Sequence, residues 1–272
     1  MDSNTTIGST FTFGRREFWP EAYLANKRAF DAFSSRVLDD LANEMFSAAD
    51  KNAVQIAEKA IYILTRLTMF GLNDVLLLVG NGSGVGAMKI VRSMFESSAL
   101  AEYFRLNPTE AKDYIDFGKV IRWRRYQWRL SNAPAAVAHY SPAQVEYIED
   151  GYQSVKGSFA NSKGKVRENW TSKRIGQIAE LVGRAKQYEE IYSLCCSLDH
   201  SNYEGLSAYA ELKDGNVTFD GPPSAAWTSA ALMYSYFYSW LALSSLNACC
   251  GLGLDRKLSE AGDVFINVWK KN

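Results

Sequence analysis

An arginine and a glutamate in the first half of the chain are the first candidates for chemistry. Arg92 and Glu96 stand one helical turn apart, and Met88 and Tyr103 belong to the same expected helix face. A guanidinium in apolar surroundings is costly unless it is paired and hydrogen-bonded. Two interpretations follow: a buried ion pair that fixes helix register, or a charged pocket wall in which Arg92 holds a carboxylate or phosphate.

A histidine in the last third of the chain is the second candidate. His200 follows Tyr188, Tyr192 and Cys196 at steps of four, so one helix would align all four side chains. The dipole at a helix C-terminus favours a cationic histidine, and histidine titrates near neutral pH. The alternative is a capping histidine above tyrosines packed in the core. His139, in an expected loop, is interpreted as structural or exposed.

A stripe of arginines is the third candidate. Arg122, Arg125 and Arg129 share one face of an expected helix, and the residues between them include Trp123, Tyr126 and Trp128. Arginines with aromatic rings can bind phosphates and stack on bases. A solvated face whose arginine stems cover apolar surface shows the same pattern. Since 30 basic and 30 acidic residues cancel, a nucleic-acid contact would have to use this local patch.

These residues support two hypotheses of function. In the first, a metal-independent enzyme cleaves a phosphodiester: His200 acts as general acid or base, Arg92 stabilises developing negative charge and Glu96 orients the arginine. The residues assigned to substrate binding are Tyr188, Tyr192, Lys89 and Tyr103. In the second, a non-catalytic module binds a small anionic ligand, a nucleic acid or a protein partner. The enzyme hypothesis requires the fold to bring Arg92 and His200 together.

The elements that position these residues are expected to be helices. Apolar residues recur at three- and four-residue steps through most of the chain. Asp214-Gly215 between two short alternating runs predicts a small β-hairpin near 208–219. Neither a repeat nor a linker marks a boundary. The sequence therefore predicts a single all-α domain over residues 1–272, a bundle of about seven to nine helices with that hairpin.

The glycine-rich stretch 80–87 has two explanations. After the apolar run Val75–Val79, the pattern Gly82-x-Gly84-x-x-Ala87 matches a relaxed dinucleotide fingerprint. That fingerprint needs a second parallel strand after the helix, whereas another helical segment follows Leu106. We therefore expect a helix–helix turn.

The cysteines and the uncharged stretch of the chain indicate the cellular compartment that we expect for the protein. The four cysteines form two adjacent pairs without a CxxC spacing, and only two histidines are present. No metal or cofactor is expected, and the setting is interpreted as reducing and cytoplasmic. Residues 221–254 carry no charge and exceed a bilayer span, but their Ser, Thr, Asn and Tyr content favours a helix buried in protein over a membrane helix. Self-association is left open.

Several short motifs occur in an order that points to a family. They are Ala87 with Arg92-Ser-x-x-Glu96, Tyr114 with Asp116, Trp170-x-Ser172, Tyr188-x-x-x-Tyr192 and Ser197-x-x-His200-Ser201. Over about residues 50–250 the chain resembles a bacterial all-helical family, domain of unknown function 5677. Such proteins are compared with helical ribonucleases of phage-defence and toxin systems, which carry Arg followed four to six residues later by His. No arginine precedes His200 or His139 at that spacing, so the comparison extends to fold only.

Overall fold

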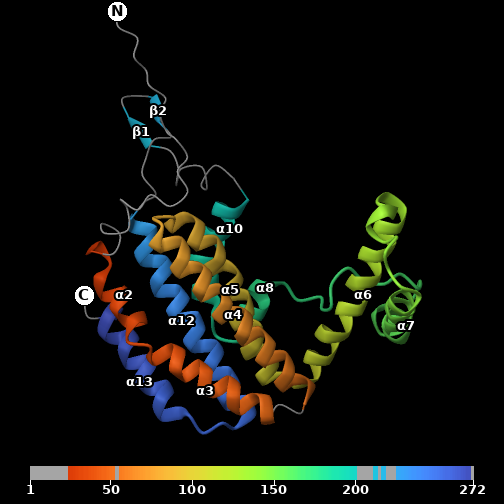
Figure 1. The fold of residues 1–272 in the computed structure, drawn as a ribbon, viewed down its shortest axis with the longest axis horizontal. Coiled ribbons are helices and arrows are strands. Elements are labelled where there is room, and N and C mark those ends of the chain that lie inside the picture. The colour runs from red at the N-terminus through yellow and green to blue at the C-terminus, as the bar shows by residue number, and fades with distance from the viewer. Residues whose placement is uncertain (1–23, 53–54, 201–210, 214–215, 219–224, 271–272) are drawn as a thin grey trace, which may run out of the picture.

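Three long helices form the centre of the molecule. The computed structural model describes residues 24–52, 55–200, 211–213, 216–218 and 225–270 (Figure 1). Helices α4 (Ile56–Gly80), α5 (Gly84–Leu106) and α12 (Ala225–Cys250) lie side by side and make the most extensive helix–helix contacts in the described residues. Their facing surfaces hold large side chains with no exposed surface, among them Leu72, Phe95 and Tyr238. The predicted helical bundle is thus confirmed.

Shorter helices cover this centre. On one side lie α2 (Lys27–Ser34), α3 (Val37–Asn52), α13 (Asp255–Phe265) and a π-helical turn, Ile266–Lys270 (Figure 1). Against α5 pack α8 (Ile175–Leu181) and α10 (Ser193–Asp199). Between those two come α9 (Ala185–Gln187) and a second π-helical turn, Tyr188–Tyr192. The predicted all-α class is confirmed.

The glycine-rich stretch is a helix–helix turn, as expected. α4 continues to Gly80, so Val75–Val79 is helical and the strand that a dinucleotide fingerprint requires is missing there. Gly82 has a φ of 75°, a conformation that glycine adopts without strain. A Cβ on Gly84 would lie 2.7 Å from the backbone nitrogen of Thr228. This glycine therefore allows α5 and α12 to approach closely.

The charge-free helix α12 is a core helix. Leu232, Leu243 and Leu246 have no exposed surface, and α12 packs on both α4 and α5. Among the described helices, only α4 is long and apolar enough to cross a membrane by length and composition. A core helix of a soluble protein meets the same criterion, so this is weak evidence for a membrane span.

Half of the predicted hairpin falls outside the described residues. Strands β1 (Glu211–Lys213) and β2 (Asn216–Thr218) pair antiparallel, with Leu212 opposite Val217. Residues 208–210, 214–215 and 219 are not among those described. A hairpin of the predicted extent over 208–219 is therefore not established.

One pair of helices projects from the bundle as an arm (Figure 1). α6 (Pro108–Asn132) runs outward, a 3-10 turn (Pro134–Ala136) reverses the chain, and α7 (Pro142–Phe159) packs back on α6. Two small clusters hold the arm together: Phe117, Val120, Val155 and Phe159 in one, and Tyr126, Val137 and Ile148 in the other. The guanidinium of Arg124 donates to the carbonyls of Val166, Arg167 and Glu168 at 3.0, 2.7 and 3.3 Å. These bonds fasten the returning segment to α6.

Candidate functional site

The fold brings Arg92 to the C-terminal end of α10. Nη1 of Arg92 donates to Oδ2 of Asp199 at 2.5 Å, across 107 positions of sequence. Nε of Arg92 lies 3.5 Å from Oε1 of Glu96, one turn along α5. Asp199 immediately precedes His200, so the segments that carry Arg92 and His200 lie next to each other, but the two residues make no hydrogen bond to each other in the described part of the chain.

Tyr192 completes this cluster. Its hydroxyl donates to Oε1 of Glu96 at 2.7 Å, and the Arg92 guanidinium lies 5.4 Å from its ring centre. Tyr188 stacks on Tyr192 with ring centres 5.1 Å apart, and Phe95 lies 5.2 Å away. Burial and the hydrogen bond to Glu96 raise the pKa of Tyr192. The phenol therefore remains a protonated donor.

The charge of the cluster bears on what Arg92 can bind. Burial alone would lower the pKa of Arg92, but its hydrogen bond with Tyr192 and the Glu96 carboxylate raise the pKa above its ordinary value. One cation thus lies between two carboxylates, Glu96 and Asp199. A phosphate would have to displace Asp199 from the guanidinium. The geometry accordingly matches the ion-pair interpretation. Arg92 pairs with Glu96 within α5 and with Asp199 of α10.

His200 caps α10 with its backbone. Its N–H donates to the carbonyl of Cys196 at 2.9 Å, and the residue is exposed. The imidazole makes no hydrogen bond or ion pair within the described part of the chain. It lies at an exposed surface next to Asp199, which pairs with Arg92.

Two of the predicted substrate-binding residues, Lys89 and Tyr103, lie on α5 but make none of the contacts described above for Arg92. Lys89 is half-buried and has no ion-pair partner among the described residues. Tyr103 is 1% exposed and packs against Phe104 and Trp170. It lies eleven residues beyond Arg92, about 16 Å along the helix. The structure therefore does not bring Tyr103 together with Arg92.

A hollow of about 480 Å³ is lined in part by Glu96. It lies between Glu96 and Leu100 of α5 and the segment 169–175, and Trp170 and Ser172 line it. Tyr114 meets Trp170 edge-on at 5.5 Å. The motif residues Glu96, Trp170 and Ser172 thus share one wall. The motif Trp170-x-Ser172 is visible in the sequence, but the spacing of its residues does not predict that they line a hollow together with Glu96.

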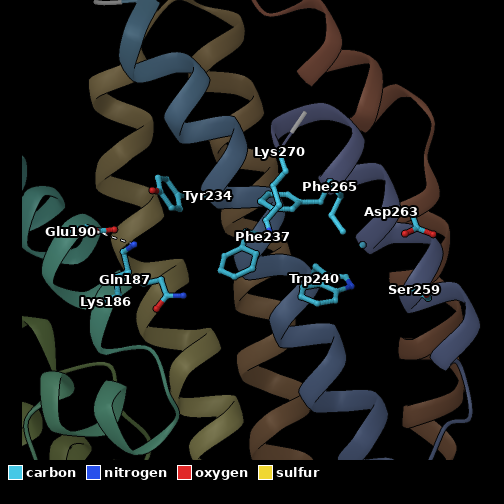
Figure 2. A pocket seen from close by; sticks show the side chains of 12 residues that line it. Lys186, Gln187, Glu190, Tyr234, Phe237, Trp240, Ser259, Asp263, Phe265 and Lys270 are labelled. Atoms are coloured by element: carbon cyan, nitrogen blue, oxygen red, sulfur yellow. Dashed lines mark ion pairs between the residues drawn. The ribbon is translucent and has the colours of Figure 1, made fainter. Parts of the chain in front are cut away.

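A larger groove of about 630 Å³ lies between α12, α13 and the α9 region (Figure 2). Tyr234, Phe237, Trp240 and Phe265 form its aromatic wall, and a Lys186–Glu190 ion pair stands at its edge. The Trp240 indole N–H is already bonded to the Leu258 carbonyl at 2.9 Å. The groove suits a flat apolar molecule, and none of the predicted site residues lines it.

The arginine stripe lies on the arm. Arg122 and Arg125 are exposed, and Nη1 of Arg129 donates to the Tyr140 hydroxyl at 3.1 Å. The Arg122 guanidinium lies 5.2 Å from the ring centre of Tyr147, which is 65% exposed. None of the three arginines has a carboxylate partner within the described ranges. They form an unneutralised cationic face.

The aromatic residues of the stripe do not all share this face. Trp123 stacks on Tyr152 of α7 at 5.0 Å, and Tyr126 is 9% exposed. Only Trp128, 63% exposed, is open to solvent. The expected alternation of arginine and aromatic surface is therefore corrected: α7 covers Trp123 and Tyr126.

Charge is segregated between residues 108–174, which comprise the arm and the segment that follows it, and the rest of the chain. Residues 108–174 contain twelve Lys and Arg against seven Asp and Glu, a net charge of +5. The remaining residues carry the compensating −5. The formal net charge of zero therefore conceals a basic region. No group of three or more potential metal ligands occurs in the described residues.

Comparison with known proteins identifies a family but no characterised relative. No curated protein and no solved structure matches the chain. Residues 59–217 match a family described as a family of unknown function (DUF5677). They include α5, α6, α7, α8 and α10, and so contain the Arg92 cluster and the arginine stripe. Because the match covers more than half of the chain, the protein belongs to this family of unknown function, DUF5677.

Proposed function

We propose that the protein binds single-stranded RNA through the arm. The observation that carries the proposal is the arginine face, defined as Arg122, Arg125 and Arg129 with the exposed rings of Trp128 and Tyr147. These arginines lack carboxylate partners in the described structure. The arm itself, residues 108–159, carries a net charge of +1, and the segment 160–174 that returns along α6 adds +4. Arginines without carboxylate partners on a projecting element attract a phosphate backbone.

The chemistry of the face favours a single strand. Trp128 and Tyr147 present rings to solvent, and unstacked bases can pack on such rings. A duplex keeps its bases stacked inside, where these rings would not reach them. Arg122 and Arg129 are separated by about 10 Å along α6, so the face can contact more than one phosphate.

The test compares two variants of equal charge change. Arg122→Gln with Arg125→Gln removes two unpaired cations, whereas Lys112→Gln with Lys119→Gln removes two cations already bonded to Asp116 at 2.5 and 2.8 Å. Binding of a fluorescent 20-nucleotide RNA is followed by anisotropy at fixed salt. We expect the arginine variant to bind at least tenfold more weakly and the lysine variant to change affinity less than threefold. Equal losses, or no binding by the unaltered protein, would refute the proposal.

A second candidate function is metal-independent cleavage of the RNA at His200. The Arg92–Asp199 contact favours it, because Arg92 lies beside the residue that precedes His200. His200 would act as general acid or base, Arg92 would stabilise developing negative charge once Asp199 is displaced, and Glu96 would orient the guanidinium. Tyr188 and Tyr192 would bind substrate. Free cysteines at positions 195, 196, 249 and 250 suit the reducing cytoplasm in which we place such an activity, in a defence or toxin setting.

This candidate has its own test. The protein is incubated with RNA in excess EDTA, and products are resolved on a denaturing gel. We expect cleavage that His200→Ala abolishes while RNA binding by the arm is retained. Full cleavage by both His200→Ala and Arg92→Ala, or its loss in EDTA, would exclude the proposed site.

A further inference from the structure

The outer face of α4 carries an apolar stripe that no other described segment covers. Ile56, Ile63, Phe70 and Leu77 recur every seven residues and are 45, 50, 55 and 65% exposed. Leu67, 50% exposed, lies between the middle two. The opposite face of α4 is buried against α5 and α12. The stripe thus runs almost the whole length of the helix, about 32 Å.

The seven-residue spacing is that of a helix–helix seam. Seven residues advance an α-helix by slightly less than two turns, so the stripe drifts by about 20° per repeat. Two helices crossing at about 20° keep such stripes in contact along their length. A long, narrow apolar stripe of this kind is therefore better suited to bind another helix than to bind a small compact ligand.

The stripe is symmetric about its own midpoint. Reversed about a point between Arg66 and Leu67, Ile56 exchanges with Leu77 and Ile63 with Phe70. The same reversal exchanges Lys59 with Asp74, which both lie on this face. Neither has an ion-pair partner in the described part of the chain. The reversal also exchanges Arg66 with Leu67 beside the midpoint. At the other positions it maps apolar onto apolar and cation onto anion, so those positions are complementary to themselves.

We propose that α4 pairs antiparallel with α4 of a second copy of the chain, about a two-fold axis between Arg66 and Leu67. Ile56 then meets Leu77 of the partner subunit, Ile63 meets Phe70 of the partner subunit, and Lys59 bonds Asp74 of the partner subunit. The contact is isologous, so each pair occurs twice. A parallel pair would instead place Lys59 against its own copy and Asp74 against its own copy, which is unfavourable.

Arg66 is compatible with this axis. Its Nη1 donates to the Tyr62 hydroxyl at 2.8 Å, and its guanidinium lies 5.2 Å from the ring centre of Phe46 in α3. The guanidinium also lies 5.8 Å from the ring centre of Phe70, so the charge stands at the edge of the stripe that adjoins α3. The inference is independent of the RNA proposal, since the arm takes no part in the contact.

The charge pair supplies the sharpest test. Sedimentation equilibrium of the full chain gives the dimer dissociation constant. We expect Lys59→Asp or Asp74→Lys alone to raise that constant at least tenfold, and the double variant to return it to within threefold of the unaltered protein. Circular dichroism confirms that each variant is folded. A monomer at every concentration, or failure of the double variant to restore the dimer, overturns the proposal.

Two single cysteine variants test whether the two α4 helices pair antiparallel. Leu67→Cys lies beside the axis and should cross-link to its own copy on mild oxidation, above the level given by the native cysteines. Ile56→Cys should not, because antiparallel pairing separates the two copies of residue 56 by about 32 Å along the helix. Cross-linking at position 56 as efficient as at position 67 contradicts the antiparallel arrangement. Flotation with phosphatidylcholine vesicles that Ile63→Glu abolishes would assign the stripe to a membrane instead.

Discussion

The bundle and the arm differ in what their helices bury. The bundle has one continuous core in which Phe95, Tyr236 and Leu243 have no exposed surface. The arm has two separate clusters of four and three buried residues. Free energy of unfolding grows with buried apolar area, so the bundle supplies most of the stability and the arm depends on it.

The arginines of the two regions differ in the same way. In the bundle, Arg184 is 5% exposed, bonds Ser98 at 3.0 Å and has its pKa lowered by burial to about 10. Arg92 bonds Asp199. In the arm, Arg122 and Arg125 are exposed and have no carboxylate partner in the described residues. Arg92 and Arg184 therefore connect segments of the bundle, whereas Arg122 and Arg125 of the arm remain available to a ligand.

The largest expected effect is in the bundle core. Phe95→Ala removes a ring with no exposed surface that contacts Tyr192 and Tyr238, and should lower the free energy of unfolding by about 3–5 kcal/mol. Urea unfolding followed by circular dichroism measures it. Phe159→Ala, the same change in a cluster of four, should release the arm and leave the main transition nearly unshifted. Equal shifts of the main transition would mean that arm and bundle unfold as one unit.

A glycine in each region gives effects of opposite sign. Gly84→Ala places a Cβ 2.7 Å from the Thr228 backbone nitrogen and should destabilise the bundle by about 1–3 kcal/mol, because two helices must separate. Gly118→Ala in α6 meets nothing within 4 Å and should stabilise by about 0.5–1 kcal/mol. Thermal unfolding of both variants measures these two changes in stability. A Gly84→Ala protein as stable as the unaltered chain would contradict the close approach of α5 and α12.

Arg124 should matter to the arm alone. Replacing it with Gln removes three hydrogen bonds to loop carbonyls, and charged hydrogen bonds contribute about 1.5–3 kcal/mol each at most. We expect faster amide hydrogen exchange in residues 160–174 and unchanged exchange in α5. Arg125→Gln, next in the chain and without such bonds, is the matched control. Slower or unchanged exchange in the loop would rule out the fastening role of Arg124.

The smallest expected effect is a pH dependence in the bundle. Burial alone would raise the pKa of Glu102, but hydrogen bonds from Arg105 and Ser245 lower it below the ordinary 4.5. The native state therefore binds this proton less readily than the unfolded state. The resulting stabilisation is complete above about pH 4.5 and is lost as pH falls through the lowered pKa. Stability of Glu102→Gln should fall less steeply between about pH 5 and pH 3, and a slope equal to that of the unaltered chain would contradict the assignment.

Several helices, such as α3 and α4, were predictable from sequence because their apolar positions recur at three- and four-residue steps, and α12 was predictable from its long uncharged apolar run. The turn between Gly80 and Gly84 was predictable as well, since a helix follows α5 where a dinucleotide fold needs a parallel strand. The basic region could have been found by counting charges over residues 108–174 alone. The total over the whole chain hides it.

Some contacts of the site depend on tertiary packing and could not be predicted from the sequence. The pattern placed Arg92 beside Glu96, but nothing in it singled out Asp199, which lies 107 positions away. Trp123 and Tyr126 occur in a run of arginines, yet α7 covers both rings. Local spacing says which residues share a face of one helix, and it does not say what covers that face.

The salt dependence of RNA affinity tests the central claim most directly. Log affinity for single-stranded RNA is measured against log salt concentration for the unaltered protein and for Arg122→Gln/Arg125→Gln/Arg129→Gln. Each phosphate contact to a single strand contributes about 0.7 to the slope, so three lost contacts should reduce its magnitude by about 2. Parallel lines for the two proteins would show that the arginine face does not contact the phosphates.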